Sequence, residues 1–438
     1  MRLLSVPLLL VLATCGPRTE PYTTAPLPED DLYLSSVPTG QTAWSNDSLA
    51  DLFVTLTHTH ENGTHRPALQ RFEGPVRVGM TGPEAEPYLA FLDAFLEQIN
   101  RHAGIDIKAT PPPHNLLIRF VPGEEFLPLT VNQCVVLFGT PSWQEYLDDP
   151  RPFSINASKA LDRQEAMTVL IPDTIEPYKV RECLLEEITQ ALGTANDLYG
   201  LADTIFNDDN AHTWPTRLDY LMLRVLYDSR VRSGLTKEDS QTRAAAILDE
   251  INPAGRNAPA LPAILQDRFK AWRKEMHLLL QPDTDDFRNR LRSRRLERVA
   301  QRKAPGTLYD CTARSMRAYI AETTGADDVT DLYRAAIELC MQVVGAADRR
   351  IATLRLERAL CDFGEERFRA ALDEAQALLP VFMAHGLDDK IAITQILLLG
   401  SAFRLDDPRW EDEYLDDAAA WSAYAFGSDH DLTQKFER

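Results

Sequence analysis

Hydrophobic and polar positions follow two different patterns along the chain and divide it into two parts. Residues 45–56 and 83–102 carry apolar side chains at the spacing of an amphipathic helix. A central helix is predicted over about residues 178–192. Short apolar runs bounded by proline, glycine or polar residues predict strands at residues 75–80, 115–121, 134–139 and 166–172. This order of elements predicts a mixed α+β domain.

Beyond the loop at residues 252–262, strand patterns cease and the chain is predicted to be helical. A segment that begins at Tyr333 recurs 35 residues later at Phe368, and an amphipathic helix is predicted between the copies at residues 351–363. We expect the second copy to end at Pro380. The interval resembles that of tetratricopeptide repeats, in which neighbouring helix pairs bury one another's apolar faces. A generic helical bundle is the alternative.

The first residues resemble a bacterial export signal. Arg2 precedes an apolar run over residues 3–12 that is too short to span a bilayer. Residues 12–15 (Leu-Ala-Thr-Cys) resemble the lipobox of bacterial lipoproteins, although threonine replaces the small residue that usually precedes the cysteine. The resemblance implies a signal peptide at residues 1–14 and a periplasmic or outer-membrane protein anchored to the membrane by lipid on Cys15. An ordinary signal peptide with an incidental cysteine is the alternative.

Composition and charge restrict the number of domains and the class of partner. With 438 residues, 44% of them hydrophobic, the chain is able to bury two cores. The net charge of −20 argues against nucleic acid as a general partner, because phosphates would be repelled. The one basic stretch, residues 288–303, is able to contact anionic lipid or an acidic surface, but such stretches are more often solvated helix faces. We expect a tether at 15–44, an α+β domain at 45–250, a linker with the basic helix at 251–306 and a helical domain at 307–438.

Five cysteines remain besides Cys15, so one of them must stay unpaired within the chain. Cys134 lies in a predicted strand of the first domain, and Cys183 lies near the start of its central helix. Two others lie at nearly equal distances from the turn around residues 325–326, which brings them to the same height in an antiparallel helix hairpin. The predicted disulfides join Cys134 to Cys183 and Cys311 to Cys340, which leaves Cys361 as a buried thiol.

The central helix carries a sequence similar to the metzincin protease pattern H-E-x-x-H-x-x-G-x-x-H/N-D. The general-base glutamate of that pattern aligns with Glu187, and its turn glycine aligns with Gly193. The three positions of the zinc ligands hold Glu186, Gln190 and Asn196. Neutral amides are weak ligands of zinc, so the resemblance implies a protease-derived fold with a degenerate metal site.

The closing aspartate of the pattern aligns with Asp197, and an acidic loop follows at residues 207–210. Together with Glu186, Glu187, Gln190 and Asn196, these oxygen ligands are able to chelate Ca²⁺, although their spacing matches no EF-hand. The competing interpretation makes Glu187 and Asp197 buried hydrogen-bond anchors and the loop a solvated turn.

The histidines do not suggest a rearranged zinc site. They occupy positions 58, 60, 65, 102, 114 and 212 in this part of the chain, and no pair of them has metal-ligand spacing within the central helix. His58 and His60 have the spacing of a strand beside a glycine-containing turn. We expect both of them at the surface.

The stretch from about residue 46 to residue 235 resembles a family of exported bacterial proteins known as domain of unknown function family 2927. The resemblance rests on residues 44–46, 183–193, 196–197, 205–209 and 226–228. Residues 216–228 are also similar to the closing helix of metzincins, with an aspartate near the start, although plain core packing explains the same apolar stripe. The family supplies no established activity.

The sequence therefore predicts an α+β zincin-like domain followed by an all-α, repeat-like helical domain. The expected function is that of a non-catalytic exported scaffold that needs no cofactor and binds envelope proteins through the helical domain. The alternative is an atypical metal-dependent peptidase in which Glu187 acts as the general base. A purely structural envelope lipoprotein is the third class.

Overall fold

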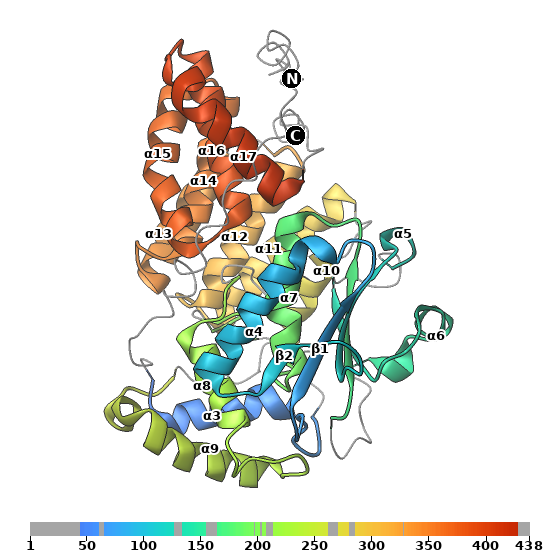
Figure 1. The fold of residues 1–438 in the computed structure, drawn as a ribbon. Helices are drawn as coiled ribbons and strands as arrows, with labels where there is room; N and C mark the ends of the chain where they lie inside the picture. The colour runs from blue at the N-terminus through green and yellow to red at the C-terminus, as the bar shows by residue number, and fades with distance from the viewer. Residues whose placement is uncertain are drawn as a thin grey trace. The chain divides into compact units, whose positions relative to one another are not determined.

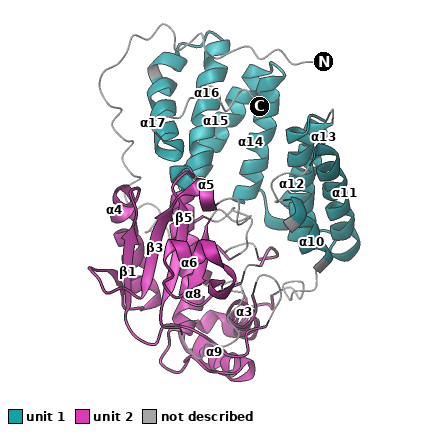
Figure 2. Ribbon diagram, turned by 90° about the vertical axis from the view of Figure 1, so that its right-hand side faces the viewer, with its two compact units in different colours: residues 1–33, 176–178, 270–438 teal, residues 34–175, 179–269 magenta. Residues whose placement is uncertain are grey.

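Two compact units make up the part of the chain that the structure, a computed structural model, describes. The described residues are 44–60, 65–126, 134–154, 164–196, 198–201, 204–206, 213–261, 270–279, 285–326 and 328–427. One unit lies within residues 34–175 and 179–269, and the other comprises residues 176–178 and the chain from residue 270 (Figure 2). Each unit has a hydrophobic cluster of its own.

The first unit is built on a five-stranded mixed sheet (Figure 1). The strand order is β2-β1-β3-β5-β4. The strands are β1 (Val76–Thr81), β2 (Ile107–Ala109), β3 (Leu116–Val121), β4 (Val135–Phe138) and β5 (Met167–Pro172). β1 pairs in parallel with β2 and β3, and β3 pairs in parallel with β5. β4 is antiparallel to β5 and forms one edge. A parallel neighbour requires a crossover connection, which α4 (Leu89–Ala103) supplies between β1 and β2.

Alternate residues of β5 face two different apolar clusters. Met167, Val169 and Ile171 belong to the main cluster of the unit. Leu170 points to the other face, where it belongs to a smaller cluster with Phe126 of α5 (Gly123–Phe126). A strand that is buried on both faces is a continuous apolar run, and for that reason the sequence revealed it.

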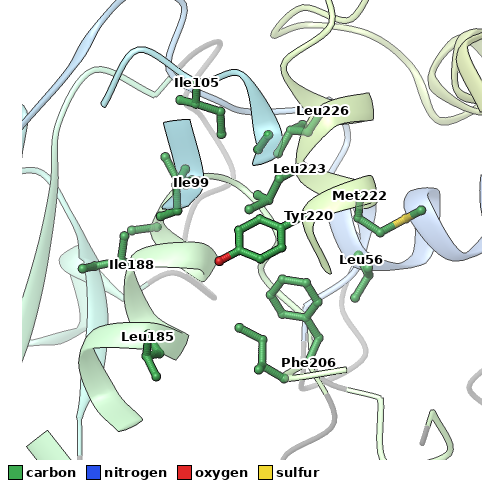
Figure 3. Close-up of a cluster of buried hydrophobic side chains, with 14 of the residues drawn as sticks. Leu56, Ile99, Ile105, Leu185, Ile188, Phe206, Tyr220, Met222, Leu223 and Leu226 are labelled. Atoms are coloured by element: carbon green, nitrogen blue, oxygen red, sulfur yellow. The ribbon is translucent and has the colours of Figure 1, made fainter. Parts of the chain in front are cut away.

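Four helices meet in the main cluster of this unit. They are α4 together with α3 (Asn46–His58), α7 (Pro177–Ala191) and α8 (Arg217–Leu226). Leu56, Ile99, Ile188 and Leu223, one from each helix, lie around the ring of Tyr220 (Figure 3). The remaining helical elements are α6 (Trp143–Asp148), α9 (Lys237–Ile251) and the 3₁₀ turns at Glu86–Tyr88, Arg151–Phe153 and Pro253–Asn257. α9 packs against α3.

The predicted mixed α+β domain followed by a helical region is present. The four predicted strands and the central helix lie within one residue or so of their expected bounds. β2 was not predicted because its three residues are too few to display an alternation. It is a strand because it pairs with β1, in the register Val76 to Ile107.

Both predicted disulfides are present. Cys134, just before β4, is joined to Cys183 of α7 with the two Cα atoms 6.1 Å apart. Cys311 is joined to Cys340 with the Cα atoms 5.0 Å apart. Cys361 is free, as expected, but it is only partly buried and not fully buried as predicted. Partial burial together with nearby carboxylates raises the pKa of its thiol to about 12. The first disulfide therefore ties the central helix to the edge of the sheet.

The second unit contains only helices among its described residues. They are α10 (Lys270–Leu279), α11 (Asp286–Lys303), α12 (Leu308–Thr323), α13 (Val329–Val344), α14 (Arg349–Gly364), α15 (Phe368–His385), α16 (Asp388–Arg404) and α17 (Leu415–Phe426), with a π-helical turn at Trp410–Tyr414. Each helix packs against the next one along the chain. The unit begins before the expected boundary, since the basic helix α11 and its neighbour α10 belong to it and not to a linker. Trp272 of α10 is fully buried and donates a hydrogen bond from Nε1 to the carbonyl of Tyr309 at 3.3 Å.

Helix α15 continues past Pro380 to His385, so the predicted end at the proline is wrong. Proline removes one helical hydrogen bond, but Leu378 and Phe382 on either side are both fully buried in one cluster. Their packing holds the helix together across the interruption. Among the described residues, no helix is long and apolar enough to cross a membrane.

Candidate functional site around the central helix

The turn after α7 is shaped by a glycine. Leu184, Ile188 and Ala191 of α7 are fully buried, which fixes the end of the helix in the core. Gly193 follows with φ of +126°, a conformation that side chains of L-residues rarely adopt. A Cβ atom on Gly193 would lie 2.7 Å from the carbonyl oxygen of Gln70. The turn expected at this position is therefore present, and both its conformation and its neighbour require glycine.

The chain beyond the turn is bound to the end of α3. The backbone N–H of Ala195 donates to the carbonyl of Leu56 at 3.1 Å. The side-chain amide of Asn196 donates from Nδ2 to the carbonyl of Thr55 at 3.0 Å. Asn196 is 1% exposed. The segment that returns a third ligand in the aligned pattern thus packs against a neighbouring helix.

A buried arginine connects the same turn to α3. Arg66 Nη1 donates to the carbonyls of Gly193 at 3.3 Å and Thr57 at 3.4 Å. Its Nη2 donates to Oε1 of Gln70 at 2.6 Å. Burial lowers the pKa of Arg66 to about 10, so the guanidinium remains charged at neutral pH. Arg66 joins three separate segments of the chain through one side chain.

His58 and His60 are buried, so the expectation that they lie at the surface is wrong. They are 1% and 3% exposed. His58 Nε2 lies 2.9 Å from Oγ of Ser240 on α9. Burial lowers the pKa of each ring to about 4, with a smaller contribution from the charge of Arg66. The cause of the error is that residues 46–58 form a helix whose last turn is covered by α9, which strand spacing cannot reveal.

The aligned ligand positions do not fit zinc. Gln190 and Glu186 lie one turn apart on α7, and Gln190 Nε2 donates to Oε1 of Glu186 at 3.3 Å. The amide nitrogen of Asn196 is likewise used in a hydrogen bond to α3. One carboxylate and two amides bonded in this way do not offer the nitrogen and sulfur ligands that zinc prefers. Among the described residues, no group of three or more His, Cys, Asp or Glu side chains is placed to hold a metal ion.

Two expected parts of this site lie outside the described residues. They are Asp197, which aligns with the closing aspartate, and the acidic loop at residues 207–210. The lipidation residue Cys15 also lies outside them. Glu187, aligned with the general base, is 7% exposed on α7 next to the pair formed by Glu186 and Gln190. Of the ligands proposed for calcium, the described structure therefore contains only those on α7 and Asn196.

The aspartate near the start of α8 is a structural anchor. Asp219 is fully buried and accepts hydrogen bonds from the backbone N–H groups of Thr216 at 2.6 Å and Ile205 at 3.2 Å, and from the hydroxyl of Thr204. Thr216 in turn caps the helix, which completes a capping box. Burial raises the pKa of Asp219 to about 6 in spite of these bonds. The plain packing interpretation of this helix is the one that agrees with its contacts.

The residues that sequence reasoning missed are Arg66, Gln70 and the aromatic side chain that closes the site. Tyr227 donates from its hydroxyl to the carbonyl of Leu192 at 3.0 Å, and the guanidinium of Arg71 stands 5.0 Å from the centre of its ring. The capping box at Thr216 is visible in the sequence, but buried arginines have no local signal because their environment comes from distant segments.

The fold and the site together define a class of protein, an α+β domain whose central helix ends in a buried polar network, joined to a helical domain. Residues 46–246 match the model of a family described as Protein of unknown function (DUF2927). This match supports the assignment of that segment to the family suggested by its motifs. No curated protein and no solved structure matches the chain.

Proposed function

We propose that the protein is an exported scaffold without catalytic activity. A zincin-like α+β domain with a degenerate metal site is joined to a repeat-like helical domain, which binds protein partners in the cell envelope. Lipid on Cys15 holds the protein at the membrane in this proposal.

The observation that carries the proposal is the hydrogen bonding at the aligned ligand positions. Gln190 donates to Glu186, and Asn196 donates to Thr55. Amides bind metals weakly and only through oxygen, so one carboxylate and two amides do not form a fitting ligand set for a zinc-bound water that Glu187 could deprotonate.

The zincin-like part of the proposal is supported by the order of elements and by the turn. One strand, a helix, four further strands interrupted by the short helices α5 and α6, and then α7 occur in the order expected of zinc-metalloprotease domains. Gly193 turns the chain directly after α7 and brings Asn196 back to buried surroundings. An inherited fold that has lost its ligands accounts for both features.

The repeat-like part is supported by a burial pattern that recurs at the predicted interval. Ala336, Ile337 and Cys340 of α13 are buried, and 35 residues later so are the corresponding positions of α15. Those positions are Ala371, Leu372 and Ala375. Recurring buried faces on successive helices are typical of arrays that present an extended surface to protein partners.

Rebuilding the ligand set tests the zincin alignment. The triple variant Glu186→His, Gln190→His and Asn196→His places imidazoles at all three aligned positions. Any two histidines four residues apart on a helix gain some zinc affinity, so the matched control is Asp93→His with Glu97→His on the exposed face of α4. We expect the triple variant to bind zinc at least about tenfold more tightly than the control pair, because a third ligand adds to the same site. Equal affinities would contradict the zincin-like fold.

The competing function is an atypical metal-dependent peptidase. It is favoured by the alignment of Glu187 with the general base on a buried helix. Elemental analysis of protein purified from the exported fraction separates the two proposals, since one tightly held zinc per chain supports the peptidase. In the scaffold proposal Glu187→Ala lowers the melting temperature by several degrees, while any background peptide hydrolysis is the same as for the unmodified protein.

Partner binding is tested by photo-crosslinking in whole cells. A crosslinking residue at Met341 on the helical unit, 42% exposed, is compared with one at Leu89 on the α+β unit, 44% exposed. We expect discrete crosslinked products from Met341 and none from Leu89. Diffuse or identical products from both sites would favour the purely structural role.

A further inference from the structure

The basic helix α11 exposes a stripe made of apolar and positively charged side chains. Phe287 and Leu291 lie one turn apart near its start and are 67% and 47% exposed. Arg294, Arg298 and Arg302 continue the stripe at helical spacing, and all three are exposed. We call these five residues the α11 stripe.

The opposite side of α11 is held firmly in its unit. Leu296 and Ala300 are fully buried. Glu297, also buried, forms an ion pair with Arg317 of α12, and Arg295 pairs with the buried Glu275 of α10 at 3.0 Å. The helix is therefore anchored by its inner face and lies at an edge of the helical unit (Figure 2), and the α11 stripe is its exposed part.

The arginines of the α11 stripe have no carboxylate partner among the described residues, and its two apolar side chains are exposed. Among the described residues, no carboxylate lies within ion-pair distance of Arg294, Arg298 or Arg302. Arg288, just beside the stripe, pairs with Asp285. In a chain with a net charge of −20, this exposed concentration of arginine is complementary in charge to an anionic surface.

We propose that the α11 stripe binds an anionic phospholipid surface. Phe287 and Leu291 insert between lipids at the headgroup level, and the three arginines contact the phosphates. Phe287 and Leu291 project from the surface of a helix and do not form a groove that could hold a peptide. A fluid lipid surface can rearrange around such projecting side chains. A helix with aromatic and aliphatic side chains next to arginines is the kind that lies in a membrane interface.

Vesicle binding of the full chain carrying Cys15→Ser tests the proposal, since this change removes any lipid anchor. Sedimentation with vesicles of phosphatidylglycerol and phosphatidylethanolamine is compared with sedimentation with phosphatidylcholine alone. We expect binding to the anionic vesicles only, and release by high salt. Arg294→Gln with Arg298→Gln reduces the partition coefficient about 25-fold, at about fivefold for each arginine. Phe287→Ser with Leu291→Ser reduces it at least about tenfold.

Matched controls come from the same unit. Arg369→Gln removes an exposed arginine, and Met341→Ser removes an exposed apolar side chain, both away from α11. The controls should bind vesicles as the parent chain does. Absence of binding to anionic vesicles, or equal binding by the stripe variants and the controls, overturns the proposal. In the first case an acidic protein partner becomes the better explanation for the α11 stripe.

Discussion

At the scale of single residues, the stability of the region around α7 depends on a few buried side chains that form hydrogen bonds and on one glycine that allows the turn. Arg66, His58 and Asn196 are all nearly inaccessible, and each bonds a segment far away in the sequence. Buried polar groups contribute stability only when they are paired, and leaving one unpaired costs about 1 to 3 kcal/mol. Substitutions here are expected to change folding before they change any activity.

Replacing Gly193 by alanine should destabilise the α+β unit strongly. The φ of +126° and the close carbonyl of Gln70 both oppose a Cβ atom, so we expect a loss of about 2 to 4 kcal/mol in the free energy of unfolding. Gly234 has a positive φ but no close neighbour, so Gly234→Ala should lower the free energy of unfolding by about 1 kcal/mol. Gly74 has neither a positive φ nor a close neighbour, so Gly74→Ala should have little effect. Urea unfolding of the three variants gives the ranking, and an equal loss at Gly193 and Gly74 would contradict it.

The buried histidines predict an acid-sensitive domain. Because the pKa of His58 and of His60 is about 4 in the folded chain and 6.5 for an exposed ring, both contribute stability above pH 6.5 that is lost as the pH falls toward 4. The loss is on the order of 2 to 3 kcal/mol for each ring. Asp219, with a raised pKa of about 6, acts in the opposite sense, since its contribution is lost as the pH rises from about 4 to 6.

Hydrogen exchange of peptides from α3 and α7 between pH 4 and 7 measures this dependence. The rates must first be corrected for the intrinsic pH dependence of exchange. His58→Gln and His60→Gln should flatten the remaining slope, while the exposed His65→Gln should leave it unchanged. If the pH dependence of exchange persists in both His58→Gln and His60→Gln, other groups cause the acid sensitivity.

At the scale of elements, each unit is fastened by a disulfide between two of its described segments. Cys134 and Cys183 are 49 residues apart, and Cys311 and Cys340 are 29 apart. The first bond links the edge of the sheet to α7, and the second links α12 to α13. Stable helical segments such as α15 continue through Pro380 because packing outweighs one missing hydrogen bond.

Removing the first disulfide should destabilise the α+β unit and leave the helical unit intact. For Cys134→Ala with Cys183→Ala we expect a loss of about 2 to 4 kcal/mol, because the unfolded chain regains the entropy of a long loop. Cys361→Ala, which removes the free thiol of the other unit, is the control. Hydrogen exchange measured separately for each unit compares the double variant with Cys361→Ala. Equal protection of α7 in both would mean that the disulfide between Cys134 and Cys183 is dispensable.

At the scale of the whole molecule, two contacts with the membrane are expected to act together. One is lipid on Cys15, and the other is the α11 stripe. Lipid on Cys15 alone is expected to hold the protein at the membrane, and the electrostatic contact of the α11 stripe is expected to add to its retention. Salt distinguishes the contributions, because it screens the arginines and not the acyl chain.

Cell fractionation of Cys15→Ser tests this combination. We expect the variant to be exported and partly recovered with membranes at low salt, and to be released entirely by a high-salt wash that leaves the unmodified protein in place. A variant that remains with membranes after the wash would refute the lipid anchor on Cys15. Salt release of the unmodified protein would refute it equally.

Much of the fold could be predicted from the sequence because the relevant signals are local. The strand at residues 167–172 is buried along its whole length, the strand at residues 116–121 is apolar apart from Arg119, and α7 has the periodicity of a helix. The disulfides could be paired because each set of cysteines fell within one expected domain. The candidate site was less accessible, since Arg66 and Tyr227 reach the turn after α7 from distant segments.

The sequence by itself indicated the two classes of structure, the turn at Gly193 and the favoured cysteine pairs, because periodicity, backbone freedom and spacing are properties of neighbouring residues. Only the tertiary structure decided that β2 is a strand, that His58 and His60 are buried, and that Gln190 and Asn196 are engaged in hydrogen bonds. It also assigned α10 and α11 to the helical unit. The physical reason is that burial and hydrogen bonding depend on which distant segments pack together, and no local pattern contains that information.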